Sequence, residues 1–173
     1  MASPPTGTLT SLFTDIEGST RLWEHDAQGM QAALARHDEL LRGAIEERGG
    51  YVFKTVGDAF CAAFLTAPDA LEAALEIQHR LLSSEWQQNE PLRVRMALHT
   101  GAAQERDEDY FGPPVNRVAR LLSAAHGGQV LLSLPTQGVG TRSASYRDDF
   151  QGPRRASSQG PLQAREGLPA FCS

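Results

Sequence analysis

Residues 51–65 read YVFKTVGDAFCAAFL, and this stretch decides the fold. Two runs of strand-forming residues, Tyr51–Val56 and 59–65, lie on either side of Gly57 and Asp58. A Gly-Asp dipeptide between two such runs is typical of a tight turn that joins antiparallel strands. The sequence therefore predicts a β-hairpin at this point in the chain.

The segments around this hairpin follow the two periodicities of regular structure. A short strand is expected at residues 9–14, and apolar residues at helical spacing predict a helix over residues 26–48, which Gly49 and Gly50 end. A second long helix is expected to open at Pro68. The further elements expected are a strand at 92–101, an acidic loop at 106–109, a helix at 115–125 and a last strand at 129–134.

Two of these segments predict which side chains are buried. The second long helix is expected to bury one side, formed by Ala70, Leu71, Ala74, Leu75, Ile77, Leu81 and Leu82. The strand at 92–101 alternates, so one face is expected to lie in the core and the other to face solvent. The side chains expected on the solvent face are Arg93, Arg95 and His99.

The order of the elements predicts the fold class and the domain limits. It is strand, helix, hairpin, helix, strand, helix, strand, which favours an α+β fold of ferredoxin-like or palm type, with helices packed on one face of a mainly antiparallel sheet. Residues 1–7 are expected to form a disordered leader, and residues 8–134 the domain itself. Residues 135–173 are rich in Gly, Pro, Ser and Arg without periodicity, which predicts an atypical tail that is disordered or disrupted.

Composition excludes several classes of protein. A length of 173 residues fits one domain, and a net charge of −5 argues against a non-specific nucleic-acid binder. Two cysteines, Cys61 and Cys172, form no disulfide framework. No apolar run approaches the roughly 18 residues of a membrane span, and residues 1–7, MASPPTG, lack the apolar stretch expected of a signal peptide. We therefore expect a cytoplasmic protein with neither a nucleic-acid nor a membrane partner.

The segment FTDIEGST, residues 13–20, places an acid where a strand ends and a helix begins. Asp15 in this position can hold a divalent metal, while the backbone N–H groups near Gly18 and Ser19 attract phosphate. The alternative is that Asp15 only caps the helix that follows.

A second polar segment lies in the hairpin itself. Asp58 at its tip is either a metal ligand or a residue of ordinary turn chemistry. Lys54 lies among apolar and β-branched strand residues, and it is the one lysine in a chain with 15 arginines among its 16 basic residues. Because the planar fork of arginine does not replace a single-point donor, this lysine indicates a specific contact.

The third segment is DYFGPPVNRVAR, residues 109–120. Asn116 and Arg120 are four residues apart and therefore share one helical face. Taken alone, Arg120 could be a solvated surface charge and Asn116 an ordinary residue of the first helical turn.

Together the three segments resemble the catalytic domain of class III nucleotidyl cyclases, the adenylyl and guanylyl cyclase family, in its bacterial form. The family's motifs appear here as FTDIEGS, KTVGD and DYFGPPVNRVAR, with HTG at residues 99–101. The resemblance covers residues 8–134 and implies that two Mg²⁺ or Mn²⁺ ions per site are held by Asp15, Asp58 and the carbonyl of Ile16. It places Glu17, Gly18 and Ser19, with Ile16, among the substrate-binding residues.

The resemblance also implies the reaction, in which the ribose 3′-oxygen of a nucleoside triphosphate attacks the α-phosphate and pyrophosphate leaves. Arg120 corresponds to the arginine that meets charge on the α-phosphate, and Asn116 to the asparagine that orients the ribose. Lys54 and Asp109 correspond to the purine-selecting pair. Lysine with aspartate predicts ATP, and hence an adenylate cyclase, a phosphorus–oxygen lyase that makes cyclic AMP for intracellular signalling.

In this family the metal carboxylates come from one protomer and the other four residues from its partner, which implies a head-to-tail homodimer. The tail departs from the family pattern, because no lysine follows residue 54 to bind the β- and γ-phosphates. Arg142, Arg154 or Arg155 could replace that cation, but their spacing singles none of them out. The alternatives are therefore a catalytically dead cyclase-like domain that binds a nucleotide or a partner and, less favoured, a guanylate cyclase. The five histidines are scattered without the spacing of metal ligands.

Overall fold

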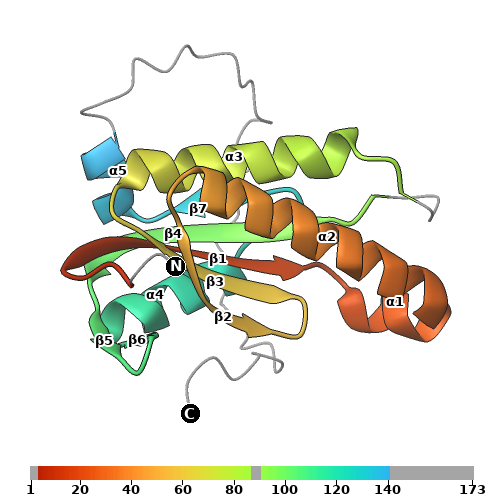
Figure 1. Ribbon diagram of the computed structural model, residues 1–173, viewed down its shortest axis with the longest axis horizontal. Helices are drawn as coiled ribbons and strands as arrows, with labels where there is room; N and C mark the ends of the chain where they lie inside the picture. Colours follow the sequence, from red (N-terminus) through yellow and green to blue (C-terminus); the bar gives the residue numbers. More distant parts are fainter. Residues whose placement is uncertain (1–3, 87–90, 141–173) are drawn as a thin grey trace, which may run out of the picture.

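The computed structural model describes residues 4–86 and 91–140. A five-stranded sheet in the order β2-β3-β1-β4-β7 forms its centre, and a separate two-stranded hairpin pairs β5 with β6 (Figure 1). The strands are β1 (Thr8–Ile16), β2 (Tyr51–Val56), β3 (Ala59–Phe64), β4 (Val94–Ala102), β5 (Gln104–Arg106), β6 (Asp109–Phe111) and β7 (Val130–Leu132). The helices are α1 (Ser19–His25), α2 (Ala27–Glu47), α3 (Ala67–Ser83), α4 (Pro113–Ser123) and α5 (Leu134–Gly140).

The predicted hairpin is confirmed. Strands β2 and β3 are antiparallel, with Val56 opposite Ala59 across the turn, and Gly57 adopts the left-handed conformation at φ 60°. All six residues of β3 are buried, since the strand lies between β2 and β1. The pairing shifts register between Val52 and Lys54, which marks a bulge just before the lysine.

Helices α2 and α3 cover one face of the sheet, as Figure 1 shows. Asp26 caps α2 by accepting a hydrogen bond from the Gly29 N–H, and Thr66 caps α3 in the same way from the Asp69 N–H. Their buried faces pack on every second residue of the strands, including Leu12 of β1. The predicted α+β class, with a mainly antiparallel sheet, is confirmed; among the described strands, β7 alone pairs in parallel, with β4.

Helix α4 packs on the opposite face of the sheet. We call this contact the second core; its members include Leu9 and Phe13 of β1, Tyr110 of β6, and Val118 and Leu122 of α4. The prediction that the helices pack on one face of the sheet is therefore confirmed for α2 and α3 and wrong for α4, which adds a layer to the other face.

The predicted solvent face of the strand at 92–101 is confirmed at Arg93, which is exposed, but it is wrong at His99 and Arg95 because of this added layer. His99 is only 3% exposed, and the Arg95 side chain is 26% exposed. Two predictions for α3 were also wrong, because Leu75 and Leu82 point outward with 43% and 76% of their surface exposed. The seven apolar positions predicted to be buried span more of the helix circumference than one sheet can cover.

Several elements differ from the predicted boundaries. The expected acidic loop at 106–109 is the turn and flank of the β5–β6 hairpin. Residues 19–25 and 134–140 form α1 and α5, neither of which periodicity indicated, because each is only seven residues long. Thr136 on α5 is buried, so the chain just after residue 134 packs on the domain.

The structure describes only part of each end of the chain. Residues 4–7 of the predicted leader have no helix or strand, and residues 1–3 lie outside the described residues. The predicted tail from residue 141, with Arg142, Arg154, Arg155 and Cys172, also lies outside them.

Candidate active site

The two predicted carboxylates meet where β1 ends and the β2–β3 hairpin turns. Asp15 is the second-last residue of β1, opposite Arg95 of β4. Asp58 follows Gly57 in the turn, and its Oδ2 accepts a hydrogen bond of 3.2 Å from the Ile16 N–H. The structure therefore brings the side chain of Asp58 to the residue next to Asp15, across 42 positions of sequence.

The electrostatics of this pair favour a bound cation. Burial raises the pKa of Asp15 above its ordinary value of 3.8, and the negative charge of Asp58 raises it further, while Arg95 opposes both effects. A half-buried carboxylate repelled by a second one is stabilised by any positive charge placed between them. Carboxylate oxygens are also the ligands that Mg²⁺ prefers. The residues present therefore fit a divalent cation.

Sequence reasoning missed one residue of this site. Arg95 donates from Nε and Nη2 to Asp15 Oδ2 at 2.9 and 2.5 Å. The prediction had placed Arg95 on a solvent face. Its cross-strand position opposite Asp15 is a property of register, which one strand's alternation does not reveal.

The first backbone N–H groups after Asp15 already make hydrogen bonds within the protein. The Ile16 N–H donates to Asp58, and the Glu17 N–H donates to the Arg93 carbonyl at 2.8 Å. The Glu17 carboxylate turns to another loop, where it accepts from the Gly127 N–H at 3.0 Å. Gly18 is left-handed at φ 71°, and α1 begins at Ser19, so the N–H groups of its first turn have no acceptor within the helix.

The predicted purine-selecting residues also meet, although 55 positions separate them. Lys54 Nζ lies 3.0 Å from Asp109 Oδ2, joining β2 to β6. Their side chains are 32% and 23% exposed, so the pair is accessible yet partly shielded from water. Asp109 Oδ1 accepts a further hydrogen bond of 2.7 Å from the Tyr110 N–H.

Asn116 and Arg120 both lie exposed on α4. The helix starts at Pro113, two residues after β6 ends, so the segment carrying Asp109 leads directly into it. The helix buries Val115, Val118 and Leu122, which turns the face with Asn116 and Arg120 away from the sheet.

The predicted residues thus form two groups on one chain. Figure 1 shows the end of β1 and the tip of the β2–β3 hairpin beside α1, at one end of the sheet. Helix α4 and the β5–β6 hairpin lie toward the other end, on the face opposite α2 and α3. The chain therefore presents a carboxylate group and a separate group of polar side chains.

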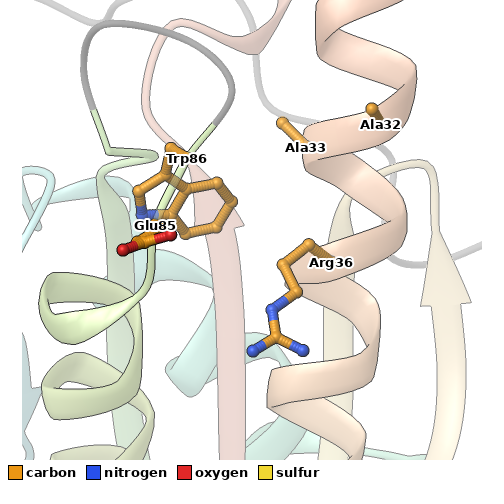
Figure 2. A pocket seen from close by; sticks show the side chains of 5 residues that line it. All are labelled: Ala32, Ala33, Arg36, Glu85 and Trp86. Carbon is orange, nitrogen blue, oxygen red and sulfur yellow. The ribbon is translucent and has the colours of Figure 1, made fainter.

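Two further features of the described residues concern metal ligands and a pocket. These residues contain no cluster of three or more His, Cys, Asp or Glu side chains arranged to hold a metal, so a cation at Asp15 and Asp58 would need other oxygens as well. A pocket of about 170 Å³ lies between α2 and the chain after α3, and Figure 2 shows the residues that line it: Ala32, Ala33, Arg36, Glu85 and Trp86. None of the predicted site residues lines it.

Among the helices that the structure describes, none combines the length and apolar character needed to cross a bilayer.

Comparison with known proteins agrees with this geometry. Residues 1–160 match the family model for the adenylate and guanylate cyclase catalytic domain. The chain therefore belongs to that family, and it is a nucleotide cyclase catalytic domain.

Three relatives illustrate the range of similarity. An uncharacterised protein of Mycobacterium tuberculosis is 47% identical over 135 residues, which are 77% of this chain and 45% of that protein. An adenylate cyclase of Lachancea kluyveri is 37% identical over 156 residues, which cover 76% of this chain and 8% of the relative. Adenylate cyclases of Trypanosoma brucei, solved in their monomeric state, align with a TM-score of 0.75 and 31% identity, over 79% of this chain and 76% of theirs. The chain thus spans about half or less of the curated relatives.

Proposed function

We propose that this domain is an adenylate cyclase that converts ATP to 3′,5′-cyclic AMP and pyrophosphate at sites shared between two copies of the chain. The observation that carries the choice of ATP is the pairing of Lys54 with Asp109 at 3.0 Å. Lysine donates to adenine N1, and aspartate accepts from the 6-amino group. Guanine presents the opposite polarity at both positions, so it would leave these partly buried groups unpaired.

The carboxylate group would hold two divalent cations, Mg²⁺ or Mn²⁺, through Asp15, Asp58 and the Ile16 carbonyl. When bound, these ions would lower the pKa of the ribose 3′-hydroxyl and neutralise the triphosphate. The raised pKa of Asp15 supports this role, because a cation relieves the repulsion between the two carboxylates. Arg95, released from Asp15 in that state, would have its guanidinium available for phosphate oxygens.

The second group of residues would act on the same nucleotide from the partner protomer. Arg120 meets the negative charge that builds on the α-phosphate, and Asn116 fixes the ribose so that its 3′-oxygen faces that phosphorus. Gly18 and Ser19 offer backbone N–H groups to the triphosphate. The position of α4 and the β5–β6 hairpin away from the tip of the β2–β3 hairpin supports a head-to-tail homodimer, in which a second copy completes each site.

The first experiment incubates the purified protein with Mn²⁺ and either ATP or GTP and measures both cyclic nucleotides. Cyclic AMP as the main product supports the proposal. An excess of cyclic GMP would assign a guanylate cyclase. If neither cyclic nucleotide forms but the protein still binds nucleotide, the domain would be a catalytically dead cyclase-like domain.

The second experiment tests the shared site by mixing two inactive variants, Asp15→Ala and Arg120→Ala. Random association makes about half of the dimers mixed, each with one intact site, so about a quarter of wild-type activity should return. Arg117→Ala, on the same exposed stretch of α4, is the matched control and should keep full activity. If mixing restores nothing although each variant still dimerises, the shared-site model is wrong.

A further inference from the structure

The hairpin that carries Asp109 is small and stands apart from the main sheet. Strands β5 and β6 have three residues each and pair only with each other. Their turn, Asp107 and Glu108, has positive φ angles of 55° and 63°, the geometry of a tight two-residue turn. An isolated two-stranded hairpin of this size is marginally stable in water, so packing must hold it in place.

One side chain supplies that packing. All three residues of β5 are exposed, and in β6 only Tyr110 is buried, with 2% of its surface exposed. Its ring meets that of Phe53 edge to face, with centroids 4.9 Å apart and planes at 75°. Phe53 precedes Lys54 and Tyr110 follows Asp109, so an aromatic pair in the second core directly supports the polar pair.

The hydroxyl of Tyr110 links the β5–β6 hairpin to the segment before β1. It donates a hydrogen bond of 2.6 Å to the carbonyl of Pro5, in the segment before β1. Burial raises the pKa of Tyr110 to about 12, so the phenol keeps its proton across the physiological range. The Tyr110 N–H also donates a hydrogen bond to Asp109 Oδ1. A continuous set of contacts therefore runs from Pro5 through Tyr110 to the Lys54–Asp109 pair.

We propose that Tyr110 is a positioning residue for nucleotide selection, and that the segment before β1 adjusts that selection through the Pro5–Tyr110 hydrogen bond. The proposal rests on the purine-selecting role proposed for Lys54 and Asp109. Displacing the segment frees the hydroxyl, lets the β5–β6 hairpin shift on its single buried anchor, and changes the position of the Asp109 carboxylate relative to Lys54. Any movement of the chain upstream of residue 5 then acts on base preference without touching the metal carboxylates.

The test compares Tyr110→Phe, which removes only the hydroxyl, with a variant that lacks residues 2–6 and therefore Pro5. Tyr51→Phe is the matched control, because Tyr51 is a half-buried tyrosine packed against the same core. The first readout is the ratio of kcat/KM for ATP to that for GTP. The loss of one hydrogen bond of ordinary strength should lower this ratio by about threefold to tenfold in either variant. The ratio should stay unchanged in the control.

The double variant separates positioning from a general loss of stability. If both changes act through one contact, combining them should lower the ratio no further than either does alone. A role in stability alone would reduce the rates with ATP and GTP by the same factor and leave the ratio unchanged, which would overturn the proposal. So would a fully multiplicative effect in the double variant.

A second readout needs no catalysis and separates this inference from the proposed function. Hydrogen exchange of the amides at residues 104–111 should become about threefold to tenfold faster in Tyr110→Phe and in the truncated variant, and stay unchanged in Tyr51→Phe. Unchanged exchange in both variants would show that the contact does not hold the hairpin. The wild type could make no cyclic nucleotide while hydrogen exchange still responds as expected. In that case the proposed function fails, and so does the inferred effect on nucleotide selection, but the role of Tyr110 in holding the hairpin stands.

Discussion

Replacing Arg95 with alanine tests the electrostatic reasoning about the carboxylate pair. Its guanidinium makes two hydrogen bonds to one oxygen of Asp15, and the two side chains are 26% and 14% exposed. Hydrogen bonds to charged groups contribute about 1.5–3 kcal/mol, and two bonds that share one acceptor are not additive. We expect Arg95→Ala to lower the free energy of unfolding by about 2 kcal/mol at pH 7.5, which is roughly 4–8 °C in Tm for a chain of this size.

The effect should depend on pH, with a sign that the pKa of Asp15 fixes. Burial and Asp58 already hold this pKa above 3.8, and Arg95 opposes them. Without Arg95 the pKa rises further, so the native variant keeps its proton where the unfolded chain has lost it. The stability of the variant therefore falls as pH rises from the ordinary aspartate pKa through this raised value, and the gap to wild type widens in the same interval.

Urea unfolding of the metal-free proteins between about pH 4 and pH 8 measures this gap. Arg36→Ala, which removes an exposed ion pair with Glu39, is the control and should change stability by less than about 0.5 kcal/mol throughout. A gap of the same size at both ends of the range would refute the reasoning, because it would mean that Arg95 stabilises the protein through packing and not through the charge of Asp15.

Two further predictions concern pH and packing. Burial, and then the charge of Arg117, lower the pKa of His99, so the unfolded chain binds a proton more readily and stability is lost as pH falls below about 6.5. The variant His99→Gln can still form a hydrogen bond with Ser133, and it should reduce this loss of stability in unfolding curves between about pH 7 and pH 5. A slope as steep as that of wild type would contradict this assignment. Leu41→Ala should cost about 2–5 kcal/mol because Leu41 is fully buried, whereas Leu82→Ala should cost under about 0.5 kcal/mol because Leu82 is 76% exposed; equal losses in Tm would place Leu82 in the core after all.

Local sequence was sufficient for the long elements and the central hairpin. Their periodic patterns run over enough residues to exclude other structures, and the turn at Gly57 needs a backbone that glycine readily adopts. The start of α1 at Ser19 was indicated by the turn residues before it, but its extent was not, and α5 was missed, because seven residues hold too few turns for a helical period to emerge.

The site residues show the same division: local motifs indicated some of them, whereas other contacts depend on how the strands pair. Motifs identified Asp15, Asp58, Lys54 and Asp109 as residues of interest, but Asp15 and Asp58 each also had an ordinary structural explanation when taken alone. The structure adds two contacts that the motifs do not contain: a carboxylate at the Ile16 N–H, and a lysine 3.0 Å from an aspartate 55 positions away. Strand alternation could not have found Arg95 at Asp15, since that contact depends on which residues of β1 and β4 lie opposite each other.

The sequence by itself determined the kinds of groups available: two acids at turns, a single lysine in a strand, and an asparagine and an arginine one helical turn apart. Only the tertiary structure decided their grouping, the burial of β4 on both faces, and the dependence of the Asp109 hairpin on Tyr110. The physical reason is that residue type and local period fix what a segment can form, whereas contacts between distant segments depend on how the sheet pairs and which faces its helices cover.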